Sequence, residues 1–404
     1  MATAALSLFR IKRRWVPVVL ALAIPSAALC QTTYQQPSFH EAVIFSGLTN
    51  PTSLRFLPDG SVLVIEKSGL IKKYDSLTST TPAVVADLRV NVHNFWDRGL
   101  MGLAIDPNFT TNHYVYVVYS HDALMGGVAP KWGPGDGTSD PCPTPPGATT
   151  DGCVISGHLS RLTAVGSSWT ASEQVLLEDW CQQYPSHSMD ALAFGADGML
   201  YVSAGEGASF YNQDWGQYGG GVGSPTPKNP CGDPPVPVGG DQTKPTAEGG
   251  SLRSQSPRRA AGEPRVLNGS VLRVDPATGA APPDNPLFGS SDLNERRIIG
   301  YGFRNPFRII AKPGTNDIWV ADVGASTYEE IDRIPDHTSA RNFGWPCFEG
   351  PMVGFTGLNI CPTQAQTISP FYTYQHTESV VPGDGCLTGS SSVAGMAFYG
   401  GASN

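Results

Sequence analysis

Short apolar segments occur in pairs along this chain, and the members of each pair are joined by a turn rich in Pro, Gly or Asp. Clear pairs occupy residues 53–64, 191–203 and 307–321, and a looser pair lies at 103–119. Each pair is typical of two antiparallel strands joined by a tight turn. Repetition of this unit predicts an all-β fold, a radial array of blades, with a β-sandwich as the alternative.

The composition supports a fold with many turns and few helices. The 404 residues include 46 Gly and 35 Pro, and only 15% are charged. Helical periodicity is hard to find beyond the N-terminal segment, whereas short apolar alternations recur. The formal net charge is −9 and no basic stripe is present, which argues against a nucleic-acid partner.

Two long insertions separate the repeated units, at residues 131–152 and 213–264. Both are rich in Gly, Pro, Ser and Asp, so we expect them to be too polar to form core. On a propeller such loops lie on one face, where substrates bind.

The first thirty residues are typical of an export signal. A basic segment at 10–14 precedes an apolar stretch at 15–24 that is too short to span a bilayer. Small residues then predict cleavage after Cys30, with a lipid-modified Cys30 as the alternative. Residues 31–404 are expected to form the mature domain, secreted or periplasmic and without stable membrane insertion.

Export would place the remaining cysteines in an oxidising compartment. Their positions favour three pairs, although spacing leaves the connectivity open: Cys142 with Cys153, Cys181 with Cys231, and Cys347 with Cys361. Cys386 has no obvious partner, and we expect that partner to lie beyond the end of this sequence.

The hairpin at 191–203 carries the strongest candidate for chemistry. His187 lies just before its first strand, and Glu206 follows its second strand. Because the two strands are antiparallel, His187 and Glu206 are expected at the same end of the hairpin. A carboxylate there could orient a catalytic base. The alternative for His187 is a hydrogen-bonded histidine at the end of a loop.

This layout resembles the glucose/sorbosone dehydrogenase family, quinoprotein sugar dehydrogenases built on a six-bladed β-propeller. In that family the histidine that matches His187 is the general base that removes a hydroxyl proton from a sugar. Further segments resemble the family in its chain order: residues 98–109, 269–276, 300–308 and 321–332. The resemblance extends from about residue 45 to about residue 399.

The resemblance also implies residues that bind pyrroloquinoline quinone. Arg304 and Asn305 match a pair that lies against this cofactor. A fixed guanidinium and an amide donor would stabilise negative charge developing on the quinone oxygen. Asp97 stands where the family has a polar residue that contacts the cofactor, and the alternative is that Asp97 caps a turn.

Calcium is the second implied cofactor. Gly324 and Ala325 match two residues whose carbonyl oxygens bind calcium in the family. Glu330 aligns with a carboxylate that binds a second, structural calcium. The alternative for Glu329 and Glu330 is a solvated loop.

The family's final blade should follow residues 398–401, and its basic residues grip the quinone carboxylates. The sequence stops at Asn404. We therefore expect a six-bladed propeller of the quinoprotein glucose dehydrogenase type that lacks its last blade in this chain, with at least five blades recognisable.

The resemblance predicts oxidation of an aldose or related sugar at its anomeric hydroxyl, with electrons passed to an external acceptor. The first alternative is a non-catalytic extracellular binding propeller of the hedgehog-interacting-protein-like type. A calcium-dependent lactone hydrolase would need acidic side chains converging on one ion, and no obvious set is present. A dinucleotide fingerprint is also absent, because Phe210 stands where a glycine would be needed.

Overall fold

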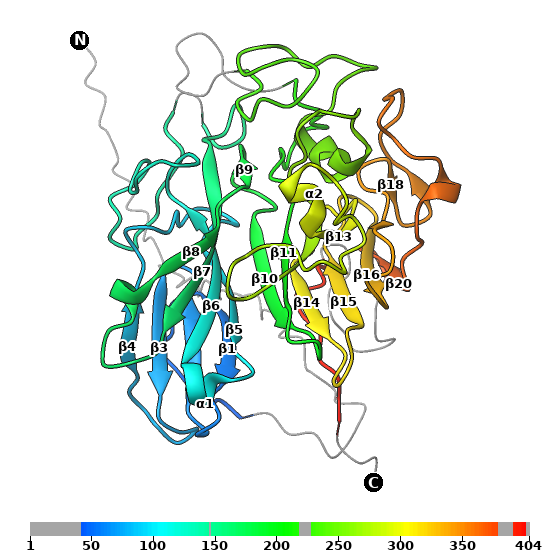
Figure 1. Ribbon diagram of the computed structural model, residues 1–404. Helices are drawn as coiled ribbons and strands as arrows, with labels where there is room; N and C mark the ends of the chain where they lie inside the picture. Colours follow the sequence, from blue (N-terminus) through cyan, green and yellow to red (C-terminus); the bar gives the residue numbers. More distant parts are fainter. Residues whose placement is uncertain (1–41, 145–146, 218–227, 379–390, 401–404) are drawn as a thin grey trace, which may run out of the picture.

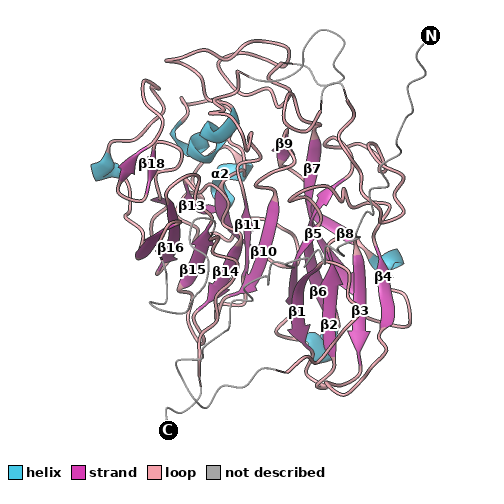
Figure 2. Cartoon of the chain, turned by 180° about the vertical axis from the view of Figure 1, so that it is seen from behind, coloured by secondary structure: helices cyan, strands magenta, loops and turns pink. Residues whose placement is uncertain are grey.

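The computed structural model describes residues 42–144, 147–217, 228–378 and 391–400. The predicted leader with its cleavage site and Cys386 lie outside the described residues. Strands dominate the described chain, and the helices are short (Figure 2). The two α-helices are α1 (Phe109–Asn112) and α2 (Leu293–Arg297), and the 3₁₀ segments are Thr170–Ser172, Gly250–Arg258 and Gln364–Gln366.

Two antiparallel sheets form the N-terminal half (Figure 1). The strands of the first sheet are β1 (Pro51–Phe56), β2 (Val62–Glu66), β3 (Leu70–Tyr74) and β4 (Ala83–Asp87). Those of the second are β5 (Leu100–Ile105), β6 (Tyr114–His121), β7 (Ile155–Thr163) and β8 (Gln174–Leu177), with β9 (Cys181–Gln182) paired to β7. Within each sheet, strands that follow one another in sequence are neighbours, as expected for propeller blades.

Two further sheets follow in the chain. The third contains β10 (Met189–Phe194), β11 (Leu200–Ala204), β12 (Ser270–Val274) and β13 (Ile298–Tyr301), and β17 (Arg341–Asn342) joins it in parallel. The fourth contains β14 (Arg308–Ala311), β15 (Ile318–Asp322), β16 (Tyr328–Ile334) and β20 (Tyr372–Gln375). A two-stranded hairpin of β18 (Phe348–Glu349) and β19 (Met352–Val353) lies between β17 and β20 in the sequence.

Each predicted strand pair forms the first two strands of a sheet, so the all-β propeller is confirmed. The first strands pack in sequence order, β5 against β1 and β10, and β10 against β14. They line a central cavity of about 770 Å³, and none of the predicted site residues lines it. The described residues form four blades, fewer than the five expected to be recognisable, because β20 completes the fourth sheet instead of starting another. The count of six stays a prediction.

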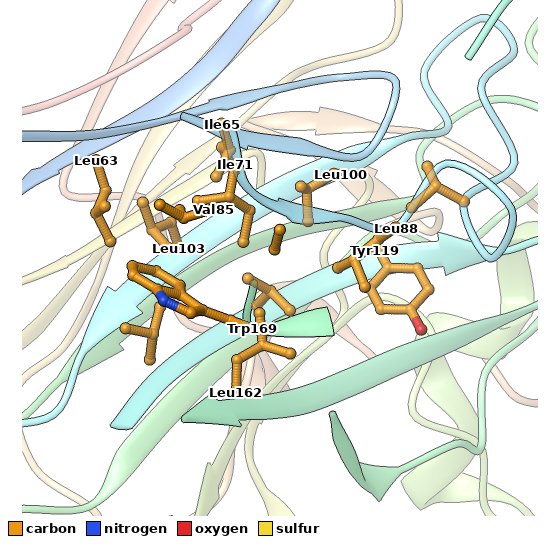
Figure 3. Close-up of a cluster of buried hydrophobic side chains, with 14 of the residues drawn as sticks. Leu63, Ile65, Ile71, Val85, Leu88, Leu100, Leu103, Tyr119, Leu162 and Trp169 are labelled. Carbon is orange, nitrogen blue, oxygen red and sulfur yellow. The ribbon is translucent and has the colours of Figure 1, made fainter. Parts of the chain in front are cut away.

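An apolar cluster joins the first two blades (Figure 3). Leu63, Ile65 and Ile71 from the first sheet pack with Leu103 and Leu162 from the second, and all are fully buried. Burying a side chain of this size contributes about 1.5–3 kcal/mol, so this cluster stabilises the packing of the two sheets against each other.

The long insertions leave the blades at one end, the upper end in Figure 1. One expectation about them was wrong: the 213–264 insertion has a buried interior. The Asp233 carboxylate accepts hydrogen bonds from Arg253 Nε and Arg259 Nη2, both at 2.8 Å, and all three side chains are fully buried. Leu252 packs nearby with Leu358. Polar composition did not prevent burial because opposite charges are paired and hydrogen-bonded.

All three expected disulfides are confirmed: Cys142–Cys153, Cys181–Cys231 and Cys347–Cys361. The second ties the 213–264 insertion to the short strand β9. In the part of the chain that the structure describes, no helix combines the length and the apolar character that crossing a membrane requires.

Candidate active site

His187 lies in the short loop between β9 and β10. These two strands meet at the end of the blades that carries the insertions (Figure 1). Its backbone is held in the left-handed region at φ 49°, which few residues other than glycine adopt. The His187 backbone N–H donates to Asp97 Oδ2 at 3.2 Å, and its carbonyl accepts from the Gly207 N–H at 3.0 Å. A Cβ at Gly205 would lie 2.3 Å from the His187 carbonyl oxygen, so this close approach requires glycine.

The structure brings His187 and Glu206 together, as the hairpin pattern predicts. His187 Nδ1 lies 2.7 Å from Glu206 Oε1, and the side chains are 3% and 1% exposed. His187 Nε2 is buried and has no hydrogen-bond partner among the described residues. The pair therefore has the geometry of a carboxylate that orients an imidazole, and the second ring nitrogen is left without a hydrogen bond.

Burial dominates the protonation of this pair. Loss of solvent lowers the pKa of His187 well below its usual value, and the Arg304 charge acts in the same direction. Burial raises the pKa of Glu206 to about 8, although the Arg304 charge opposes that change. The two groups share one hydrogen bond, so they titrate as a unit.

Arg304 and Asn305 lie in the loop between β13 and β14. Their backbone N–H groups donate to Asp322 Oδ2 and Oδ1, at 3.0 and 2.6 Å. The Arg304 carbonyl accepts from the Glu206 N–H at 3.0 Å, so this loop is attached to the end of the His187 hairpin. Arg304 Nη1 donates to the carbonyls of Val323 and Gly324, at 3.0 and 2.6 Å.

The side chain of Asn305 is oriented by Asp190, a residue that the sequence reasoning missed. With its amide nitrogen facing Asp190, Asn305 donates to the two carboxylate oxygens at 3.2 and 3.3 Å. Asp190 is almost fully buried in β10, and burial raises its pKa well above the usual value. A charged residue inside the apolar segment of β10 was the available signal.

Gly324 and Ala325 lie in the turn between β15 and β16. The Glu349 carboxylate organises this turn, because its Oε1 accepts from the backbone N–H groups of four consecutive residues, 325–328, at 2.9–3.1 Å. Burial raises the pKa of Glu349, but these hydrogen bonds outweigh it and the net shift is downward. The Gly324 carbonyl oxygen accepts a hydrogen bond from the Arg304 guanidinium.

Glu330 is not in a solvated loop. It lies in β16 opposite the end of β15, 7% exposed, and Glu329 is fully buried. One oxygen each of Asp322, Glu330 and Asp332 lie within 4.8 Å of one another. Both carboxylate oxygens of Asp332 are buried without a hydrogen-bond partner among the described residues. Such a set of hard oxygen donors fits calcium.

Burial raises the pKa of all three carboxyl groups in this triad. The pKa of Asp322 rises to about 7, and those of Glu330 and Asp332 rise well above their usual values. Charge repulsion within the triad adds to the effect of burial on Glu330 and Asp332. A divalent cation would reverse this effect and stabilise the ionised carboxylates.

Exposed aromatic side chains lie beside His187. Phe210 has its ring centroid 6.1 Å from the His187 ring, and Tyr211 lies 5.1 Å from Phe210. Trp96 contacts Tyr211 edge to face at 6.2 Å, and it is 40% exposed. Asp97, the residue after Trp96, is also exposed and contacts the His187 backbone. Exposed aromatic rings of this kind can stack on a flat ligand.

The chain matches the family model described as Glucose / Sorbosone dehydrogenase over residues 48–230 and 249–403. The chain belongs to this family. The match includes every residue proposed above for the site, from Asp97 to Glu330, and it confirms the family that the sequence segments resemble.

Relatives of this glucose/sorbosone dehydrogenase family protein are distant. The HIPL1 protein of Arabidopsis thaliana is 25% identical over 350 residues, which cover 78% of this chain and 42% of that protein. An uncharacterized protein of Synechocystis sp. is 23% identical over 317 residues, covering 77% of this chain and 60% of its own length. The chain thus spans about half the length of these curated relatives.

A solved structure supports the fold. The PQQ-bound form of aldose sugar dehydrogenase from Streptomyces coelicolor is similar with a TM-score of 0.52 and 18% identity. The likeness covers 84% of this chain and 72% of that one. At this identity it shows a common propeller fold and leaves substrate and cofactor open.

Proposed function

We propose that this protein is a quinoprotein dehydrogenase that oxidises an aldose or related sugar at its anomeric hydroxyl. The observation that carries the proposal is the buried His187–Glu206 pair. His187 Nε2 has no hydrogen-bond partner among the described residues, and the Glu206 N–H donates to the Arg304 carbonyl, which attaches the Arg304 loop to this pair. Membership of the glucose/sorbosone dehydrogenase family supports the same reaction class. The three disulfides support a secreted or periplasmic location.

The chain's own residues have distinct tasks in this proposal. His187 Nε2 accepts the proton of the anomeric hydroxyl, while Glu206 holds Nδ1–H and stabilises the imidazolium that forms. Arg304, Asn305 and Asp97 would hold pyrroloquinoline quinone. When bound, this cofactor would supply a hydride acceptor, from which electrons pass to an external acceptor. A buried base with a free nitrogen beside a fixed guanidinium fits that group.

Calcium would have two places. The carbonyls of Gly324 and Ala325 would hold the ion next to the cofactor, where Arg304 now contacts Gly324. Glu330, with Asp322 and Asp332, would hold a structural ion.

The function is tested by loading the protein with pyrroloquinoline quinone and calcium and measuring reduction of an artificial dye with aldoses as donors. Failure to reduce dye with any aldose would exclude it.

The similarity to the HIPL1 protein supports a second candidate, a non-catalytic extracellular binding propeller. The dye assay separates the two functions, because only the dehydrogenase turns over.

We expect kcat/KM to rise with pH and level off above about pH 8. The base form needs an ionised Glu206 and an unprotonated His187 Nε2. Because burial raises the pKa of Glu206 to about 8, lowering the pH below that value returns a proton to the pair and removes the active form. Glu206→Gln should lower the plateau value of kcat/KM. The fall of kcat/KM with decreasing pH should then follow His187, whose pKa is lowered by burial, and so begin at a lower pH. An unchanged profile in Glu206→Gln would contradict this role.

Calcium is expected to stabilise the protein through the Asp322–Glu330–Asp332 triad. At a free concentration 100 times the Kd, calcium would add about 2.7 kcal/mol to the free energy of unfolding, seen as a higher Tm that EGTA reverses. Asp332→Asn should raise the Tm of the metal-free protein, because it removes repulsion between buried carboxylates. The same variant should lose most of the calcium response. Equal calcium responses in the two proteins would show that the triad is not the site.

A further inference from the structure

A second cluster of ligand-type side chains lies in the second blade, away from the residues assigned to sugar oxidation. His121 ends β6, His158 lies in β7, and Glu178 follows the last residue of β8. Tyr119 pairs with His158 and His121 pairs with Ser156, so both rings lie on one face of the sheet. The rings stack at a centroid distance of 3.8 Å, and both histidines are buried.

The spacing of the cluster suits a metal ion. One ligand atom each of His121, His158 and Glu178 lie within 4.8 Å of one another. Glu178 Oε1 is 3.4 Å from His158 Nε2 and 3.9 Å from His121 Nδ1. Ligands at about 2.0–2.2 Å from a tetrahedral zinc ion are separated by roughly 3–4 Å, which matches these distances. The two rings are stacked at an interplanar angle of 21°, so they would have to turn apart for both lone pairs to point at the ion.

The hydrogen bonds around His158 leave the lone pair of its Nε2 directed toward the Glu178 carboxylate. The Tyr119 hydroxyl donates to Glu173 Oε1 at 2.7 Å, so the Tyr119 oxygen is left to accept the His158 Nδ1–H at 3.0 Å. In the neutral ring, Nε2 then carries no proton. It is buried, has no hydrogen-bond partner among the described residues, and faces Glu178 Oε1. The two acceptors therefore face each other at 3.4 Å, an arrangement that a cation between them would stabilise. Glu178 Oε1 also has hydrogen-bond donors in the Gly126 N–H and the Ser156 hydroxyl.

The second histidine has a polar neighbour of its own. His121 Nδ1 lies 3.2 Å from Ser156 Oγ, and that hydroxyl can donate instead to the Ala123 carbonyl at 3.1 Å, which would leave His121 Nδ1 to the ion. The Tyr119 hydroxyl, which in turn donates to Glu173, orients the His158 ring through Nδ1. Metal-binding histidines in known sites are oriented by similar hydrogen bonds from the second ring nitrogen.

We propose that His121, His158 and Glu178 form a binding site for a zinc-type divalent transition-metal ion. Two imidazoles and one carboxylate are a donor set that zinc accepts, and three protein ligands leave a fourth position for water. Glu178 is 25% exposed, which gives the ion access from solvent. Glu178 also accepts from the Gly126 N–H at 2.8 Å, so the ion would connect the outer edge of the blade to the loop after β6.

The test is a titration of the chelator-treated protein with Zn²⁺ in saturating calcium, followed by calorimetry. We expect one equivalent to bind to the wild type, and Co²⁺ in its place to give the visible absorption of a tetrahedral site. Glu178→Gln and His158→Gln should abolish both signals. Glu178 is partly exposed, so its variant remains informative should His158→Gln fail to fold.

His113→Asn is the matched control, because His113 is an exposed histidine at the other end of β6. It should retain the equivalent of zinc and the cobalt spectrum. The proposal is overturned when the wild type binds no zinc, or when Glu178→Gln binds it as the wild type does. Cobalt that binds without tetrahedral absorption would also overturn it.

Discussion

His187→Ala is expected to lower kcat for sugar oxidation by roughly 10²–10⁴-fold, the contribution of a positioned general base. His187→Ala should lower kcat and leave cofactor binding unchanged, because Arg304 is positioned by its hydrogen bonds to the Val323 and Gly324 carbonyls and not by the His187 ring. The measurement is dye reduction by the loaded protein, with cofactor retention followed by its absorption.

His337→Asn provides the control for that experiment. His337 also faces a carboxylate, with Nε2 3.1 Å from Asp284 Oδ2, but that pair lies in an exposed part of the structure. The control should keep wild-type turnover. An active protein whose turnover is indifferent to His187→Ala would remove the catalytic assignment and favour the binding propeller.

Asp233→Ala is expected to lower the free energy of unfolding by about 3–5 kcal/mol. The carboxylate accepts a hydrogen bond from each of Arg253 and Arg259, and the three side chains are fully buried. Its removal takes this partner from both buried guanidinium groups, and Arg259 keeps only one carboxylate contact among the described residues, the longer one of its Nε with Glu248 Oε2 at 3.5 Å. Denaturant unfolding of the disulfide-bonded protein measures the difference.

A matched variant tests whether burial is the cause. Asp241 lies in the same insertion and pairs with Lys228 at 2.9 Å, but both side chains are about half exposed. Asp241→Ala should cost less than about 1 kcal/mol, because solvent screens exposed pairs. Similar losses in the two variants would show that the buried network is not what stabilises the insertion.

Local pattern was sufficient to predict the strands and the contact between His187 and Glu206. The hairpins at 53–64 and 191–203 are encoded by apolar alternation and a turn, which involve residues near one another in the chain. The same reasoning places His187 and Glu206 together, because both flank one hairpin and its strands are antiparallel. The disulfides could be anticipated for a similar reason, since Cys142 and Cys153 flank a single loop.

Contacts between distant segments could not be predicted in this way. Asp190 orients Asn305, and Glu349 organises the turn at 325–328, although no periodic pattern relates these positions. The buried Asp233 network arises in an insertion whose composition predicts exposure.

By itself, the sequence predicted the all-β class, the resemblance to the family, three favoured disulfide pairs whose connectivity it left open, and the pairing of His187 with Glu206. Only the tertiary structure decided that β20 completes the fourth sheet, that Glu330 joins a buried carboxylate triad, and that the second blade brings His121, His158 and Glu178 together. The physical reason is the range of the interactions. Turns and alternation act between neighbours in the chain, whereas burial, ion pairing and ligand clusters depend on which strands the fold places side by side.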